Sequence, residues 1–342
     1  MAYISFQPHD YFNTKLYTGT GSAQSITGVG FQPDLIWGKN RSATWNHIFT
    51  DAVRGANKQI SSNLTNAEES NTGEFTAFGS DGFSVGTGST LNGSGNNICS
   101  WNWKANGQGS SNTDGSTAST VSVNITAGFS IVKWTGSGSA TTIGHGLGVT
   151  PKIIMLKNTS EVYGWQVYHA SLGNTKYLAL DSTDASATSS QSWNNTSPTS
   201  TVFSVGASDS NNKSGNTIIA YCFAEKKGFS KFSSYTGNGS SSNSPFIYTG
   251  FKPAFIIIKK DATDYWFMYD NKRGDINANA KTLKANTSDA EGTSGKEIDF
   301  LSNGVKIRNS NNSINTSGST YIYMVFAEEP LVASNGIPAT AR

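Results

Sequence analysis

Two pairs of acidic residues are the first candidates for catalysis in this 342-residue chain. Glu68 and Glu69 stand side by side, and Asp289 is followed two residues later by Glu291. Glycoside hydrolysis needs two carboxylates that face one bond, so such pairs deserve a test. Both pairs lie in segments rich in Asn, Ser and Thr, and the corresponding middle segment has only Asp184. We therefore expect solvated loops at these positions and no catalytic pair.

Other patterns that carry chemistry are incomplete in this sequence. The four histidines occur singly, without His-x-x-x-His or Cys-x-x-Cys spacing, which argues against a zinc site; they are His9, His47, His145 and His169. Gly19-Thr20-Gly21 and Gly136-Ser137-Gly138 lack the lysine and the following helix of a phosphate loop, so hairpin turns are expected. No Gly-x-Ser-x-Gly elbow is paired with a histidine and an acid. The sequence predicts no enzyme, no cofactor and no metal, and it does not identify receptor-binding residues.

Three tryptophans and two cysteines each have two interpretations. The tryptophans could bind sugars or pack in the core, and the cysteines could form a disulfide bridge or remain free thiols. Trp45, Trp165 and Trp266 could stack on sugar rings, but they recur with apolar neighbours as core residues do, and we expect them in the core. Cys99 and Cys222 fall in corresponding segments, yet neither has a partner within its own segment, and we expect two small buried thiols.

A pattern repeated three times, with a period of about 100 residues, positions all of these residues. In each copy a proline is followed six residues later by a lysine; the pairs are Pro33 and Lys39, Pro151 and Lys157, Pro253 and Lys259. A second lysine precedes an apolar residue by two; these pairs are Lys58 and Ile60, Lys176 and Leu178, Lys281 and Leu283. Each copy closes with a glycine followed eight residues later by an aromatic residue; the aromatics are Trp103, Phe223 and Phe326. Such a fixed order of landmarks indicates three copies of one domain.

The apolar runs between proline and lysine predict the architecture. They are apolar at both odd and even positions, which is typical of a strand covered on both faces. No window has a sustained helical period, and each copy contains six to eight short strand-like segments. We predict an all-β fold of three tandem antiparallel β-sandwich, jelly-roll-like domains. Trp101, Tyr221 and Met324 should share a strand face with the closing aromatics.

The predicted boundaries follow the repeats. Residues 1–11 form an N-terminal arm, and residues 330–342 form a C-terminal tail. The three β-sandwich domains span 12–107, 128–228 and 229–329. The Gly/Ser/Asn/Thr-rich segment around 108–127 is predicted to be a linker or an exposed loop.

Charge and hydropathy restrict the partners. Only 14% of the residues are charged, the net charge is +2, and no basic run occurs, so we expect no nucleic-acid partner. The first residues lack the features of a signal peptide, and no apolar stretch approaches the roughly 18 residues that cross a bilayer. We expect a protein made in a cytoplasm, with no membrane insertion.

One repeat resembles a known group of proteins. The resemblance lies in Phe31-Gln32-Pro33-Asp34-Leu35-Ile36-Trp37-Gly38-Lys39-Asn40-Arg41-Ser42, in Asp51-Ala52-Val53-Arg54-Gly55, and in Ser80-Asp81-Gly82-Phe83-Ser84-Val85-Gly86. Similar repeats occur in bacteriophage virion proteins, common in marine phages including those of cyanobacteria. The second copy departs most, with Leu172-Gly173 where the others have Arg54-Gly55 and Arg273-Gly274. The resemblance carries over no catalytic residue.

These observations lead to one expected function and two alternatives. The resemblance implies a non-enzymatic virion protein, preferably a tail fibre or surface appendage that contacts the host by multivalent adhesion. A capsid decoration or knob protein and a surface-glycan depolymerase are the alternatives. The expected partners are copies of the same chain, with a trimer favoured, other virion proteins, and a host surface glycan or protein. Tyr3, Ile4 and Phe6, and the tail residues Leu331, Val332 and Ile337, are the segments expected to pack between copies.

Overall fold

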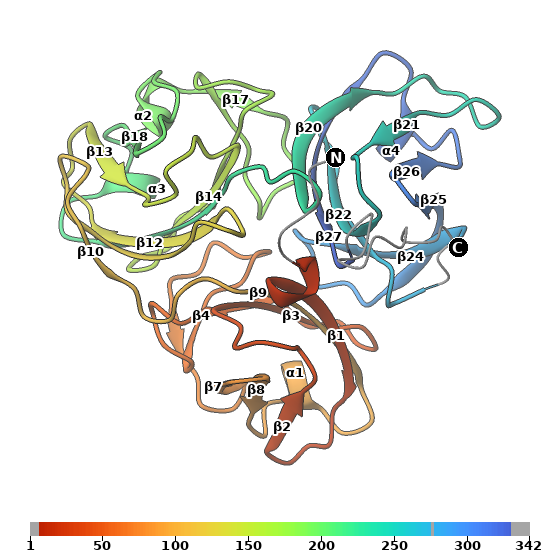
Figure 1. The fold of residues 1–342 in the computed structure, drawn as a ribbon, viewed down its shortest axis with the longest axis horizontal. Helices are drawn as coiled ribbons and strands as arrows, with labels where there is room; N and C mark the ends of the chain where they lie inside the picture. Colours follow the sequence, from red (N-terminus) through yellow and green to blue (C-terminus); the bar gives the residue numbers. More distant parts are fainter. Residues whose placement is uncertain (1–6, 275–276, 330–342) are drawn as a thin grey trace.

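Three lobes surround a common centre in the computed structural model, which describes residues 7–274 and 277–329 (Figure 1). Among these described residues, every pairing between two named strands is antiparallel, and the four α-helices have four residues each. The fold is therefore all-β, as the sequence predicts. The arm residues Tyr3, Ile4 and Phe6 and the tail residues 330–342 lie outside the described residues.

The first lobe (red to orange in Figure 1) holds the first repeat. Its elements are η1 (Pro8–Asp10), β1 (Phe12–Thr18), β2 (Gln24–Thr27), β3 (Leu35–Asn40), β4 (Ile48–Asp51), β5 (Lys58–Gln59), β6 (Glu69–Ser70), β7 (Phe75–Gly79), β8 (Gly82–Val85), α1 (Ser89–Asn92) and β9 (Asn97–Trp103).

The second lobe (yellow to green) holds the second repeat. Its elements are β10 (Ser110–Asn112), β11 (Ser119–Asn124), β12 (Phe129–Thr135), β13 (Thr141–Gly144), β14 (Ile153–Asn158), β15 (Gln166–His169), β16 (Lys176–Tyr177), β17 (Ala187–Thr188), α2 (Ser190–Trp193), β18 (Val202–Val205), α3 (Asp209–Asn212) and β19 (Thr217–Phe223).

The third lobe (teal to blue) holds the third repeat. Its elements are β20 (Ser230–Thr236), β21 (Phe246–Tyr248), β22 (Pro253–Lys260), β23 (Trp266–Asp270), β24 (Asn279–Lys284), β25 (Gly292–Leu301), β26 (Gly304–Ile307), α4 (Asn312–Asn315) and β27 (Thr320–Ala327).

The strand order is the same in the inner sheet of each lobe. The sheets run β1-β9-β3-β4, β12-β19-β14-β15 and β20-β27-β22-β23. The strand that follows the repeated proline (β3, β14 or β22) is therefore internal, and nearly all of its residues are buried. This confirms the prediction from its apolar pattern. In the third lobe the sheet continues through β24, β25 and β26 to β21 and bends into a nearly closed barrel.

Two kinds of core cover the two faces of each inner sheet. One face packs on the outer strands of the same lobe, as Phe83 and Val85 of β8 do in the first lobe. The other face packs on a single core that all three lobes share. We call the core between the inner sheet and the outer strands of one lobe its private core, and the core common to all three lobes the shared core. An inner strand is apolar on both sides because one side faces the private core and the other faces the shared core.

The shared core is centred on the three closing aromatics. The ring centroids lie 5.7 Å apart for Trp103 and Phe326, 5.8 Å for Phe223 and Phe326, and 6.2 Å for Trp103 and Phe223. Tyr221 and Met324 belong to the same core, and so does Trp101, which confirms the predicted face. We call Trp103, Phe223 and Phe326 the aromatic triad. The repeated landmarks thus meet at the centre of the molecule.

The segment predicted as a linker or exposed loop, residues 108–127, differs from that expectation. It contains β10 and β11, which extend the inner sheet of the second lobe beyond β12. Val121 is buried in the private core of that lobe, and Val123 packs against it. The alternation of Ser and Thr with Val is a strand pattern that the surrounding Gly/Ser-rich residues conceal.

Candidate functional site

The junctions between lobes bring most of the candidate residues together. Trp165 donates its indole N–H to the Ser61 carbonyl oxygen of the first lobe at 2.9 Å. Trp266 donates in the same way to Ala179 of the second lobe at 2.9 Å. Both rings are buried, which confirms the core prediction for these two tryptophans. The second and third lobes thus each donate a hydrogen bond to the lobe that precedes them in the chain.

The prediction is wrong for Trp45, which is 39% exposed. Strand register places His47 at the position of Trp165 and Trp266, and its Nε2 lies 3.0 Å from the Lys284 carbonyl oxygen of the third lobe. Trp37 donates its indole N–H to His47 Nδ1 at 2.9 Å. The indole of Trp37 fills the space beside this smaller ring, so no second tryptophan is needed there.

Three buried lysines hold the loops at these junctions. Each lysine donates to a carbonyl oxygen of the loop that follows its own strand; the acceptors of Lys39, Lys157 and Lys259 are Ala43, Tyr163 and Ala262. Each also lies within 3.4 Å of a carbonyl from the preceding lobe; these acceptors are Ser288, Thr65 and Thr183. Burial lowers the pKa of each lysine to about 8. The repeated lysine is therefore a connector between lobes.

Two junctions contain a buried arginine held by two acids. At the junction of the first and second lobes, Arg54 pairs with Asp51 at 2.5 Å and with Glu68 at 3.2 Å. Tyr221 of the second lobe donates its hydroxyl to Asp51 at 2.8 Å. Burial acts to lower the pKa of Arg54, but the charges of Asp51, Tyr221 and Glu68 together with the hydrogen bond to Asp51 outweigh it and raise the pKa.

The junction of the third and first lobes repeats this arrangement. Arg273 pairs with Asp270 at 2.5 Å and with Glu291 at 3.1 Å, and Trp101 of the first lobe donates to Asp270 at 3.0 Å. The expectation of solvated loops is thus wrong for Glu68 and Glu291. Both carboxylates turn inward because a buried guanidinium needs compensating charge. Glu69 and Asp289 are exposed, as expected.

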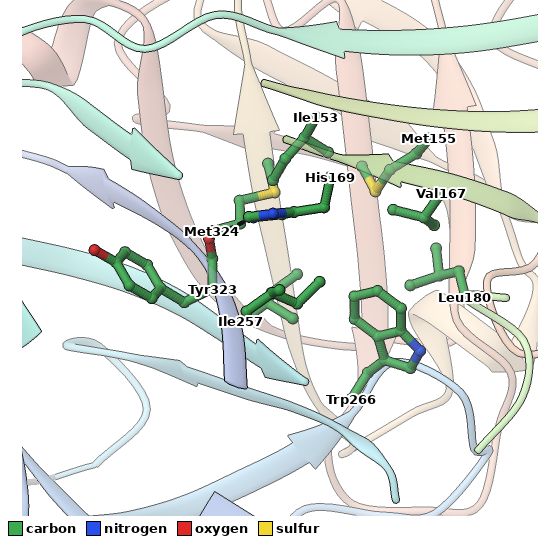
Figure 2. A pocket seen from close by; sticks show the side chains of 10 residues that line it. Ile153, Met155, Val167, His169, Leu180, Ile257, Trp266, Tyr323 and Met324 are labelled. Atoms are coloured by element: carbon green, nitrogen blue, oxygen red, sulfur yellow. Dashed lines mark hydrogen bonds between the residues drawn. The ribbon is translucent and has the colours of Figure 1, made fainter. Parts of the chain in front are cut away.

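The junction of the second and third lobes has no such arginine. His169 and Leu172 occupy the positions of Asp51 and Arg54, and His169 Nε2 lies 3.3 Å from the Tyr323 carbonyl oxygen. Figure 2 shows apolar side chains from both lobes, among them Val167 and Ile257, around a cavity of about 20 Å³. Such a volume accommodates about one water molecule. Burial lowers the pKa of His169 to about 4, so a neutral ring completes an apolar contact.

A polar groove remains open at the junction of the first and second lobes. At the junction of the third and first lobes the corresponding space holds Arg41, which pairs with Glu291 at 2.9 Å. The residue in register with Arg41 is Thr159, which is too short to reach Glu68. The space left has a volume of about 190 Å³ and is lined by Arg54, Glu68, Lys133, Thr159, Ser160 and Thr217.

The groove continues along the second lobe. A neighbouring depression of about 320 Å³ shares Lys133 and Thr217 with it. Its other lining residues come mainly from β10, β11 and β12; they are Ser111, Ala118, Ser119, Thr120, Trp134 and Thr135. We call the two depressions together the junction groove. At the junction of the third and first lobes, by contrast, β1 is the edge strand and Arg41 occupies the corresponding space.

The junction groove has the chemistry of a binding site. It offers hydroxyl groups and one lysine, while Glu68 is held by Arg54 at 3.2 Å and by Lys58 at 3.5 Å. Both carboxylate oxygens of Glu68 are therefore engaged by ion pairs within the protein. Among residues 7–274 and 277–329, no three His, Cys, Asp or Glu side chains are grouped to hold a metal ion.

The remaining sequence candidates lie in the interior or in turns. Cys99 and Cys222 are free and buried, as predicted. His145 is buried, with its Nε2 3.3 Å from the Thr199 carbonyl oxygen. No helix in the described part of the chain is both long and apolar enough to span a bilayer.

The class defined by these features is an all-β protein of three repeats closed around one core. The chain belongs to the family described as a domain of unknown function (DUF7483), whose profile matches residues 7–330. One profile therefore covers all three lobes, so the family unit is the whole three-lobed body. No curated protein and no solved structure matches the chain.

The groove residues and the roles of the charged connectors are not predicted from the sequence. Lys133, Thr159 and Thr217 belong to no motif, and their proximity depends on how two lobes meet. A signal did exist for the connectors, because a lysine that ends an otherwise apolar, buried strand needs special partners. The recurrence of Asp and Arg at a spacing of three was a second such signal.

Proposed function

We propose that this protein is a non-enzymatic structural protein of a bacteriophage particle, part of a tail fibre or similar surface appendage that contacts the host. The observation that carries the proposal is the locking of three related lobes around the aromatic triad. One chain thereby presents three related lobes at fixed separations, and an assembly of several chains presents each lobe more than once. Fixed presentation of weak sites raises the effective concentration of the second and third contacts.

The proposal includes a jelly-roll-like β-sandwich in each lobe and assembly of the chain into a trimer. The inner sheet and the outer strands that enclose a private core support the first part. Light scattering on the purified protein tests the second part. A trimer has three times the 36.3 kDa mass of one chain, whereas a mass of 36.3 kDa at micromolar concentration would reject it.

A capsid decoration protein is the second candidate, because a body with three similar lobes suits a threefold position on a shell. Quantitative mass spectrometry of purified particles, with heads and tails separated, distinguishes the two. A fibre is found with tails at low copy number. A decoration protein is found on heads, at a copy number set by the capsid lattice. Absence of the protein from purified particles would reject both the fibre and the decoration proposals.

A further inference from the structure

We propose that the junction groove binds an acidic saccharide. This inference deepens the proposed adhesion, on which it rests for the source of the glycan. The ligand class is assigned to one groove. This groove lies between β10, β11 and β12 of the second lobe and the first-lobe residues Arg54 and Glu68.

Hydroxyl groups give the groove its first match to a sugar. Serine and threonine side chains donate and accept hydrogen bonds, as sugar hydroxyls do. Seven serine and threonine residues line the two depressions; they are Ser111, Ser119, Thr120, Thr135, Thr159, Ser160 and Thr217. The Ser119 and Thr159 hydroxyls already donate to the Gly144 and Thr217 carbonyl oxygens, and the Ser160 hydroxyl accepts from the Thr217 N–H. The two depressions are open rather than enclosed and adjoin at Lys133 and Thr217, which suits a chain of sugar units that enters and leaves the site.

Charge selects an acidic sugar over a neutral one. The charged groups at the groove are Asp51, Arg54, Lys58, Glu68 and Lys133. The first four balance, because Arg54 pairs with Asp51 and Glu68, and Lys58 pairs with Glu68. Lys133 donates to the Val53 carbonyl oxygen at 3.2 Å, and no described carboxylate lies within ion-pair distance of it. One positive charge is left for a ligand carboxylate or sulfate.

The comparison of junctions shows that this positive charge belongs to one groove. At the junction of the third and first lobes, Leu16 is in register with Lys133, and Arg41 fills the space beside Glu291. A single-stranded nucleic acid is a poorer match, because it is normally held by exposed aromatic rings as well as by cations. Among the described residues that line the groove, Trp134 is the one aromatic residue, and its side chain is buried in the private core.

Two substitutions test the site with the full-length protein. Lys133→Met removes the uncompensated charge, and Thr159→Arg copies the arginine that closes the corresponding space beside Glu291. Lys231→Met is the matched control, since Lys231 is a half-buried lysine on β20, the counterpart of β12 in the third lobe, away from the groove. The probes are an array of uronic acid-containing, sialylated and sulfated oligosaccharides with their uncharged counterparts, and a polyuridylate oligonucleotide.

We expect the wild-type protein and Lys231→Met to bind at least one class of acidic oligosaccharide and to prefer it over its uncharged counterpart. Lys133→Met should weaken that binding about tenfold, as expected for loss of a charge-assisted hydrogen bond. Thr159→Arg should weaken it at least as much, and equal unfolding midpoints would show that the variants are folded. If Thr159→Arg does not fold, Lys133→Met against Lys231→Met decides the result.

Three results would overturn the assignment: no acidic oligosaccharide is bound, charged and uncharged probes bind equally, or Lys133→Met binds as well as the control. Tighter binding of the polyuridylate than of any oligosaccharide would replace the ligand class and also overturn it. Failure of the proposed virion function is a separate outcome. In that case the protein is missing from purified particles, while saccharide binding through Lys133 remains.

Discussion

Truncation of Phe223 to alanine tests the aromatic triad directly. Phe223 is fully buried, and four rings surround it: Phe129 at 4.8 Å, Phe326 at 5.8 Å, and Trp103 and Phe232 at 6.2 Å between centroids. Loss of a buried phenylalanine costs about 3–5 kcal/mol. We expect the upper part of that range, because the surrounding rings belong to three different sheets and cannot all move into the cavity.

The measurement is unfolding in urea or guanidinium chloride, followed by tryptophan fluorescence. Because the three lobes share one core, the wild-type protein should unfold in a single transition, and the variant should shift its midpoint without a change of slope. Phe246→Ala is the matched control, since Phe246 is 43% exposed on β21, and it should change stability by less than about 0.5 kcal/mol. A cost below about 1 kcal/mol for Phe223→Ala would show that the triad does not hold the lobes together.

Three further predictions concern the junctions and the buried thiols. Arg54→Leu leaves Asp51 without its guanidinium partner and should lower the free energy of unfolding by about 3–5 kcal/mol in chemical unfolding. The double variant Asp51→His with Arg54→Leu, which copies His169 and Leu172, should recover more than half of that lost stability. An equal loss of stability in both variants would contradict the charge argument. The pKa values of Lys39, Lys157 and Lys259 are about 8 in the folded protein against an ordinary 10.5, so above pH 8 the unfolded chain binds more protons at these lysines, and each should raise stability with pH by at most about 1.4 kcal/mol per unit. The two buried thiols, whose ordinary pKa is 9.0, oppose this rise because they ionise in the unfolded chain over the same pH range. The test is therefore the difference between proteins: between pH 8 and 9, Lys39→Met should lower the slope by up to about 1.4 kcal/mol per unit relative to the wild-type protein, whereas Lys231→Met should leave the slope unchanged. Burial raises the pKa of Cys99 to about 12 and also raises the pKa of Cys222. Iodoacetamide at pH 8 should therefore label neither thiol until the chain is unfolded. Rapid labelling of the native protein would refute the packing of β9 and β19.

The sequence was sufficient for the repeats, the all-β class and the inner strands. Pro33, Pro151 and Pro253 are followed by apolar runs, and each run is an internal, buried strand. This part was predictable because periodicity reports directly on how many faces of a strand are covered. The closing aromatics were also recognisable as core residues. Their meeting at one centre was not, because a repeat pattern does not state how the copies are arranged.

The junctions required the structure for a different reason. Spacing alone aligned Trp45 with Trp165 and Trp266, but loop lengths differ between repeats, and His47 holds the position. Glu68 and Glu291 are in polar surroundings along the chain, while their buried partners belong to a turn more than ten residues away. The groove depends on Thr159 and Lys133 from different strands and on a wall formed by β10 and β11. Local patterns contain none of these long-range relations.

A reconstruction of the intact particle by electron microscopy is the most direct test of the proposed function. The account predicts density for a three-lobed body, with the aromatic triad at its centre, on the tail or on a surface appendage. It also predicts that the junction groove between the first and second lobes is open to solvent. Purified particles that lack this protein, or a position in which the particle itself covers the groove, would contradict the account.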